Sequence, residues 1–326
     1  MQLPYSETKV SRRLLSGYYK KNSHELINIK YCPMQPEIIN EINEYLKETA
    51  QNLGISGYNE KTNRGLLRHV IYRISSDLTQ ILIIFVVNSN TVDSKLKQLS
   101  EVLTKKYSAI KGICANFNTK RTNVITGDIT KVITGQNFYI ETLGGKKYKV
   151  SASSFFQVNP YCAELIFNRV KELIKARMQN PSILDAYSGV SSFGIWLSDI
   201  AKEVTSIEEV KSASNDAVEN IKLNNITNLK VINGDAGKEF EKLIQQGVKF
   251  DVSVTDPPRK GCSNESIEYL SKLTSKYIVY VSCNPSTLAR DVKLLMEQGF
   301  KLEYIQGIDM FPNTYHIECI AVLTKV

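Results

Sequence analysis

The chain has 326 residues, a net charge of +8 and 42% hydrophobic residues, which is an ordinary composition for a globular protein of one large domain or, as we expect, two. Its longest apolar run, at 81–87, is too short to span a bilayer, and no apolar segment follows the basic residues near the start as in a signal peptide. The sequence therefore argues against a membrane or secreted protein, and we expect a cytoplasmic location.

Charge is distributed unevenly along the chain. Residues 1–150 carry 22 Lys and Arg against 12 Asp and Glu, whereas residues 151–326 carry 19 against 21. A basic half of this kind favours a polyanionic partner, with nucleic acid foremost, over a solvated basic surface that has no partner.

The first half predicts a compact α+β domain over residues 1–150. Apolar residues at helical spacing predict helices at 36–54 and 92–105, and β-rich runs predict strands near 66–88 and 113–118. The segment 123–151 is typical of successive hairpins, with Gly-Asp and Gly-Gly as turn signals.

The second half, residues 151–326, alternates short apolar strands with helices. This pattern predicts a doubly wound α/β domain with a mostly parallel sheet, and the last two strands form an antiparallel pair at one edge. The expected helices lie at 160–177, 210–224, 236–246, 264–274 and 285–298.

Polar residues follow four successive strands of this predicted sheet. The first strand leads into a turn with Gly189, the second ends at Glu208 or Glu209, and Asp235 and Asp256 follow the next two. Ligands of open α/β sheets bind at the carboxyl ends of the strands. A flexible turn, an acid for ribose hydroxyls and an acid for an adenine amine together predict an adenosine site.

The turn over residues 189–194 favours one adenosine cofactor over others. It lacks the second glycine of the NAD fingerprint, and no lysine follows to bind ATP phosphates. S-adenosylmethionine has no phosphate, and its positive sulfonium suits this slightly acidic half. We therefore expect S-adenosylmethionine, with an NAD-dependent enzyme as a weaker alternative.

Five ordered motifs carry a specific resemblance: FFQVN at 155–159, DAYSGVSSFG at 185–194, DPPRKG at 256–261, SCNP at 282–285 and DMFPNTYHIE at 309–318. In this order they resemble the RNA 5-methyluridine methyltransferases, which use S-adenosylmethionine to methylate C5 of uridine in ribosomal or transfer RNA. The resemblance implies a Rossmann-like methyltransferase domain preceded by a smaller α+β domain. It extends more weakly into the first half, at 17–27 and 66–73.

The chemistry of this family needs a thiol and a base. C5 of uracil is a poor nucleophile, and a thiolate that adds to C6 activates it. Cys283, at a strand end, is the expected nucleophile, and by resemblance Glu318 is the base that removes the C5 proton. We interpret the other cysteines as core residues, because no CxxC pair or metal-ligand spacing is present, and we expect no metal site: Cys32, Cys114, Cys162, Cys262 and Cys319.

The resemblance also implies binding residues. Those expected to bind the cofactor are Gln157, Tyr187, Gly189, Ser192, Glu208, Asp235 and Asp256. Those expected to bind the substrate are Phe156, Asp256, Arg259 and Arg68. Phe155 remains an alternative to Phe156, and Asp256 could instead cap the following helix. Arg259 and Lys260 either bind RNA phosphates or are free charges, and His316 is expected to orient the Glu318 loop.

Attack on C6 requires a uridine that is splayed out of its stack, which is easiest in a single-stranded loop. We therefore expect RNA as the partner, held by basic residues of the first half, and no obligate protein partner. Candidates are Arg12, Arg13, Lys20, Lys21, Arg64, Arg68 and Arg73.

The sequence departs from the family in several places. The small barrel-shaped RNA-binding domain of many members and the three clustered cysteines of others are not recognisable, so we expect no iron–sulfur cluster and either a shortened or a naturally short member. Ser188 stands where cysteine is usual, and Ser191 where glycine is usual, so we expect Ser191 to crowd the approach of the cofactor.

The prediction is therefore a uridine C5-methyltransferase, with 23S ribosomal RNA favoured over transfer RNA. A cytosine C5-methyltransferase and a catalytically idle RNA-binding protein remain alternatives.

Overall fold

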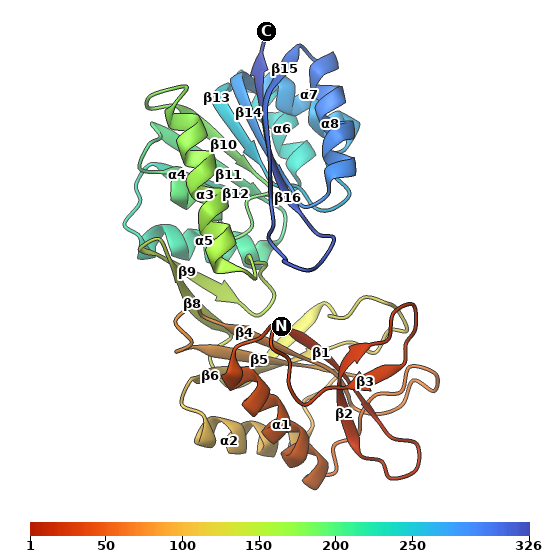
Figure 1. Cartoon of the computed structure of the whole chain (residues 1–326). Helices are drawn as coiled ribbons and strands as arrows, with labels where there is room; N and C mark the ends of the chain where they lie inside the picture. Colours follow the sequence, from red (N-terminus) through yellow and green to blue (C-terminus); the bar gives the residue numbers. More distant parts are fainter. The chain divides into compact units, whose positions relative to one another are not determined.

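A computed structural model describes residues 1–326, and its contacts divide the chain into two compact units (Figure 1). The first unit comprises residues 1–141 and 151–153, and the second comprises residues 142–150 and 154–326. No helix in either unit is both long and apolar enough to cross a membrane.

The first unit is built on a seven-stranded sheet with the order β3-β2-β1-β4-β5-β6-β7. Neighbouring strands are antiparallel except β5 and β6, which are parallel. The strands are β1 (Gln2–Glu7), β2 (Leu14–Tyr19), β3 (Leu26–Asn28), β4 (Leu67–Ile74), β5 (Ile81–Val87), β6 (Ile110–Phe117) and β7 (Ile129–Gly135).

Two helices, α1 (Glu37–Asn52) and α2 (Ser94–Lys106), pack on this sheet and complete its core. The apolar side chains of α1 recur at helical spacing and are buried with those of α2 against β4 and β5. All seven residues of β5 are buried, as expected of a strand covered on both faces. The unit is thus the predicted α+β arrangement.

Strands β1 to β3 were not predicted, because their burial does not alternate regularly and β3 has only three residues. The prediction of successive hairpins at 123–151 is confirmed for one pair of strands and wrong for the other. Strands β8 (Phe138–Leu143) and β9 (Lys146–Ser151) do pair around Gly144 and Gly145, but β7 pairs with β6 rather than with β8.

The second unit contains a seven-stranded sheet with the order β12-β11-β10-β13-β14-β16-β15. The five strands β10 to β14 are parallel to one another, and β16 is antiparallel to both β14 and β15. Chain order reverses between β10 and β13. The strands are β10 (Ser182–Ala186), β11 (Glu203–Glu208), β12 (Leu229–Asn233), β13 (Phe250–Thr255), β14 (Thr274–Ser282), β15 (Phe300–Ile308) and β16 (Glu318–Lys325).

Helices cover both faces of this sheet (Figure 1), which confirms the predicted doubly wound fold with an antiparallel edge. The apolar sides of α6 (Ala236–Gln245), α7 (Asn264–Leu273) and α8 (Pro285–Glu297) share one core with the central strands. The helices of the other face are α3 (Pro160–Lys175), α4 (Ser192–Leu197) and α5 (Lys211–Leu223). Helix α4 was not predicted, because its six residues are too few to show a periodicity.

Residues 142–150, which the sequence analysis placed in the first domain, pack with the second unit. The backbone N–H of Lys147 donates to the side chain of Asn224 (2.9 Å), just after α5, and that of Lys149 donates to the side chain of Asn220 (2.6 Å), on α5. The division between the units therefore falls inside the β8–β9 hairpin.

Candidate active site

The parallel register brings four strand ends to one edge of the second sheet. Ala186 at the end of β10 pairs with Ile207 of β11 and with Thr255 of β13, and Glu208 pairs with Asn233 of β12. The residues that follow these strands therefore meet at the point where chain order reverses, which is where α/β sheets bind ligands.

Glu208, and not Glu209, is tied into this edge. Its Oε2 accepts a hydrogen bond from the N–H of Gly189 (2.7 Å) and its Oε1 accepts one from the N–H of Val210 (2.7 Å), whereas Glu209 is exposed. A carboxylate has about four acceptor positions, so two remain for ligand hydroxyls.

The turn after β10 is held from beneath by Asp185. This buried carboxylate accepts hydrogen bonds from the N–H of Gly194 (2.9 Å) and from Oγ of Ser206 (3.0 Å). Burial raises the pKa of Asp185 to about 7, although these two hydrogen bonds oppose the shift. Asp185 thus shapes the turn rather than facing a ligand.

Left-handed backbone runs through the same turn, at Tyr187 (φ 59°), Gly189 (φ 56°) and Ser191 (φ 61°). No atom lies within 4 Å of the position where a Cβ would be on Gly189, so the turn is open there. The expectation that Ser191 crowds the cofactor is wrong, because its side chain is fully buried and hydrogen-bonds Oγ of Ser206 (2.7 Å). The buried Oγ of neighbouring Ser188 has no partner.

Asp235 is exposed after β12, and one of its oxygens caps α6 by accepting from the N–H of Lys238 (3.1 Å). The edge therefore offers carboxylates for hydroxyl and amine groups, together with an open turn. The turn segment 185–194 contains no lysine or arginine to meet a phosphate. These acceptor groups and the absence of basic residues in the turn fit an adenosine group that is joined to an uncharged or positive centre.

Cys283 lies directly after β14 and directly before the helix cap of α8. Asn284 is that cap, and its Oδ1 accepts from the N–H of Ser286 (3.1 Å), while Pro285 starts the helix. A helix N-terminus favours the ionised form of a thiol beside it, in opposition to burial and to the neighbouring carboxylates, which raise the pKa of Cys283. The local sequence thus explains why the strand stops and leaves a partly buried cysteine at its tip.

Glu318 is the first residue of β16, which runs antiparallel to the strand that ends before Cys283. Ser282 of β14 pairs with Cys319 of the antiparallel strand β16, so the next opposed residues beyond the ladder are Cys283 and Glu318. Glu318 is 6% exposed. The structure therefore brings together the two residues that the sequence predicted as nucleophile and base.

Two carboxyls and a guanidinium act on this thiol. Burial, and then the charges of Glu318 and Asp256, raise the pKa of Cys283, and Arg259 opposes the rise. Burial raises the pKa of Glu318 to about 7, and Arg259 again lowers it. Burial, with the charges of Glu318 and Asp185, raises the pKa of Asp256 to about 8. The alternative of Asp256 as a helix cap is wrong, since Ser263 caps α7.

The FFQVN motif is divided between the core and the surface. Phe156 is buried against Tyr148, with ring centroids 5.4 Å apart, whereas Phe155 is 66% exposed, so Phe155 is the aromatic that is free to meet a ligand. Gln157 is partly buried, as is Ser192 at the start of α4. Nδ2 of Asn159 donates to the carbonyl of Met310 (3.0 Å), which ties this motif to the segment that leads to Glu318.

Arg68, predicted to contact substrate, is 5% exposed in the first unit. Its guanidinium donates to the carbonyls of Asn118 (2.7 Å) and Lys120 (2.9 Å) and lies 4.4 Å from the ring centroid of Tyr58. These contacts give Arg68 a structural role. Other candidates for RNA contact are exposed: Arg12, Arg13, Lys20, Lys21 and Arg64; Arg73 is partly buried.

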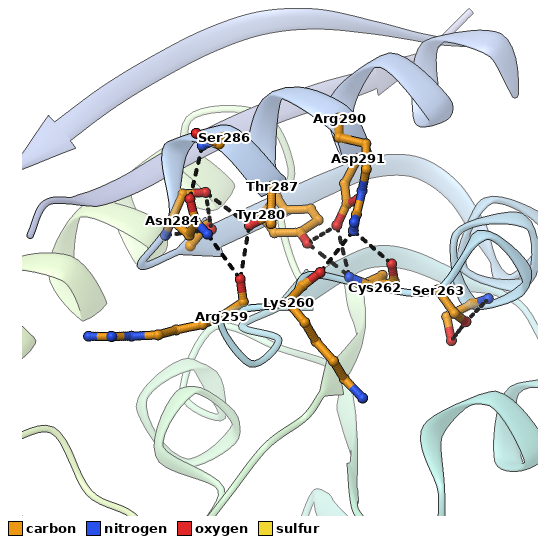
Figure 2. Close-up of polar contacts among 12 residues, drawn as sticks. Arg259, Lys260, Cys262, Ser263, Tyr280, Asn284, Ser286, Thr287, Arg290 and Asp291 are labelled. Atoms are coloured by element: carbon orange, nitrogen blue, oxygen red, sulfur yellow. Dashed lines mark hydrogen bonds and ion pairs between the residues drawn. The ribbon is translucent and has the colours of Figure 1, made fainter. Parts of the chain in front are cut away.

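Arg290 and Asp291, which were not predicted from the sequence, connect the loop at the end of the DPPRKG motif to α8 (Figure 2). The available signal was the position of Asp291 on α8, seven residues after Asn284, which places it on the same helix face as Asn284.

Comparison with known proteins decides the family. A family model described as tRNA (uracil-5-)-methyltransferase matches residues 17–326. The chain belongs to this family. As a member, it is an RNA methyltransferase, which the motifs predicted.

Relatives of this methyltransferase extend the match. A Bacillus cereus protein described as an RNA methyltransferase is 38% identical over 325 residues, which cover 100% of this chain and 70% of that protein. The Pyrococcus abyssi tRNA (uracil-54, C5)-methyltransferase, solved with S-adenosyl-L-homocysteine, has a TM-score of 0.80 and 29% identity, covering 99% of this chain and 74% of that one. That ligand agrees with the predicted cofactor, S-adenosylmethionine. The M. jannaschii tRNA m1G37 methyltransferase shares the fold alone, with a TM-score of 0.52 at 18% identity over 87% of this chain and 78% of that one.

Proposed function

We propose that this methyltransferase transfers a methyl group from S-adenosylmethionine to C5 of a uridine in RNA, with Cys283 as nucleophile and Glu318 as base. The observation that supports this most strongly is the opposition of these two residues where β14 and β16 end their pairing. Each alone is an ordinary polar residue, whereas together they supply both groups that the reaction needs.

The Cys283 thiolate forms a bond to C6 of the uracil ring, and the electron pair moves through C5 to O4 as an enolate. C5 then takes the methyl group, and the bond between the sulfonium and that methyl breaks. Glu318 takes the C5 proton, the C5–C6 double bond re-forms and the thiolate leaves. A base whose pKa is about 7 suits proton transfer near neutral pH.

The cofactor residues proposed are those at the strand ends. Glu208 would accept from ribose hydroxyls, Asp235 from the adenine amine, and Gly189 leaves room for close approach. Gln157, Tyr187, Ser192 and Asp256 complete the proposed set. When bound, S-adenosylmethionine supplies the electrophilic methyl group.

For the RNA, 23S ribosomal RNA is the target proposed from the motifs. Transfer RNA is the second candidate, because the Pyrococcus abyssi relative is a tRNA (uracil-54, C5)-methyltransferase. The exposed basic residues of the first unit are the proposed RNA contacts.

Labelled S-adenosylmethionine, incubated with the protein and total RNA from a strain that lacks 5-methyluridine, tests the activity. We expect label in 5-methyluridine, and mapping assigns it to ribosomal or transfer RNA. Label in 5-methylcytidine, or none in any RNA while the cofactor binds, would reject the proposal.

The nucleophile is tested with 5-fluorouridine RNA, whose C5 fluorine cannot be removed as a proton. Wild-type protein is expected to form a covalent adduct that survives denaturing electrophoresis, and Cys283→Ala is expected to form none. Cys162→Ala, which changes another partly buried thiol, serves as the control and should retain the adduct. An adduct on Cys283→Ala would mean that another residue attacks.

A further inference from the structure

A buried carboxylate joins the loop of residues 258–262 to both β14 and α8 (Figure 2). Asp291 is 0% exposed, and its Oδ2 accepts hydrogen bonds from the N–H of Cys262 (2.8 Å) and the hydroxyl of Tyr280 (2.5 Å). Its Oδ1 accepts from Nε of Arg290 (2.7 Å). Hydrogen bonds to a charged acceptor are stronger than neutral ones, and removing such an acceptor leaves its buried donors unpaired.

Arg290 holds the same loop by its carbonyl groups. Its Nη2 donates to the carbonyls of Lys260 (3.0 Å) and Cys262 (3.0 Å). Gly261, between them, has φ +73°, and a Cβ there would lie 2.5 Å from both Nη2 of Arg290 and Oδ2 of Asp291. The loop therefore passes so close to this ion pair that only glycine fits.

The start of α8 holds the remaining end of the loop. The carbonyl of Arg259 accepts from Nδ2 of Asn284 (3.1 Å) and Oγ1 of Thr287 (3.3 Å). Asn284 directly follows Cys283, so the loop is fastened to the helix that begins beside the thiol. In Figure 2 the side chain of Arg259 extends away from these contacts.

The guanidinium of Arg259 is exposed and takes part in no hydrogen bond, so its location depends on the backbone beneath it. We propose that Arg290 and Asp291 are positioning residues for methyl transfer, which fix the 258–262 loop on α8 and so keep Arg259 beside Cys283 and Glu318. The inference rests on the proposed role of Cys283 as nucleophile.

The reactivity of the thiol tests this without RNA or cofactor. The full chain is treated with iodoacetamide over a range of pH, and alkylation of the Cys283 peptide is followed by mass spectrometry. Glu318 and Asp256 raise the pKa of this thiol and Arg259 lowers it, so displacing Arg259 should move the alkylation midpoint to higher pH. In Arg290→Ala we expect alkylation at neutral pH to slow about three- to tenfold, a shift of up to about one pKa unit.

Three further variants make the result specific. Lys293→Ala removes an exposed charge from the same helix and should leave the profile unchanged. Asp291→Asn should resemble Arg290→Ala; if it fails to fold, Arg290→Ala suffices, because the Arg290 side chain is 48% exposed. The double variant Arg259→Ala/Arg290→Ala should be no slower than Arg259→Ala alone, since Arg290 acts through Arg259.

An unchanged profile in Arg290→Ala, or additive effects in the double variant, would overturn the positioning role. Either result leaves the methylation assay untouched. Conversely, absence of methyl transfer in wild-type protein would reject the proposed function without altering the alkylation profile.

Discussion

At the scale of single residues, the site contains two carboxyls, Asp256 and Glu318, whose pKa values burial raises. The variant Glu318→Gln removes the proposed base. The amide cannot take the C5 proton, whereas the thiol can still add and the methyl group can still transfer. Turnover should fall at least about 100-fold, and a methylated covalent protein–RNA complex should accumulate with ordinary uridine RNA. Denaturing electrophoresis measures this complex when the methyl group of S-adenosylmethionine carries the label. If the variant turned over normally and carried no label, a residue other than Glu318 would be the base.

Two carboxyls of the site should make the stability of the fold depend on pH. The pKa values of Asp256 (about 8) and Glu318 (about 7) lie above the unfolded value of about 4 for such groups. The folded chain therefore keeps protons that the unfolded chain loses between about pH 4 and pH 8. Stability from these groups is fully present below about pH 4 and is lost as pH rises toward 8.

Urea unfolding at pH 6 and pH 8.5 measures this effect. Asp256→Asn should lower the pH dependence of the free energy of unfolding relative to wild type, because the amide cannot ionise. Glu297→Gln, which alters an exposed acid on α8, is the control and should leave that dependence as it was. Equal pH dependence in all three proteins would contradict the prediction.

The candidate residues were predictable where a motif names them. Cys283 and Glu318 lie 35 positions apart. In the sequence only the order of the family motifs connects them, and in the structure the register of the sheet does. Burial was not predictable in the same way. FFQVN has two adjacent aromatics, and nothing local distinguishes the buried Phe156 from the exposed Phe155. The burial of Arg68 could not be predicted either, because its two carbonyl partners lie about 50 residues away in the sequence.

At the scale of elements, helix caps also tie functional segments in place. Asn159 caps α3 through Oδ1, which accepts from the N–H of Cys162 (3.2 Å), and its Nδ2 donates to Met310. Asn159→Ala should cost about 1 kcal/mol of stability, as loss of a cap does, and should speed hydrogen exchange in residues 309–317. Ser263→Ala removes the cap of α7, which has no such tether. It should cost a similar amount without altering exchange in that segment.

Exchange measured by mass spectrometry separates the two variants. Equal protection of residues 309–317 in both would mean that the Asn159–Met310 hydrogen bond does not hold the segment.

Elements with strong periodicity were predictable, and those defined by long-range pairing were not. The five long helices of the second half begin within one residue of their expected positions, because caps and apolar spacing are local signals. Strand β14 begins three residues before the expected apolar run, since its first residues are polar and gain their strand geometry by pairing with β13. Strands β1 to β3 depend on their neighbours in the same manner.

At the scale of the whole molecule, charge separates the two units. The first carries 19 Lys and Arg against 12 Asp and Glu, and the second carries 22 against 21. Lys20, Lys21 and Lys30 are exposed residues of the first unit. Replacing all three by Ala should weaken RNA binding whatever the RNA sequence, and should reduce the slope of log affinity against log salt by about two to three. Replacing the exposed Lys230, Lys293 and Lys301 of the second unit is the matched control.

Filter binding at several salt concentrations measures both variants. Equal losses in the two triple variants would show that RNA contact is not concentrated on the first unit.

The pairing of β14 with β16 has a consequence for how the reacting pair is kept in place. The ladder sets which residue of β16 lies opposite the thiol, so this register does not depend on the loop residues 309–317, which connect β15 to Glu318. That loop carries Tyr315, 90% exposed and 4.2 Å from the ring of His316. Substitutions of such exposed side chains should therefore leave the thiol and the carboxylate opposite each other, so the reacting geometry is inherited from the sheet and not from the loop.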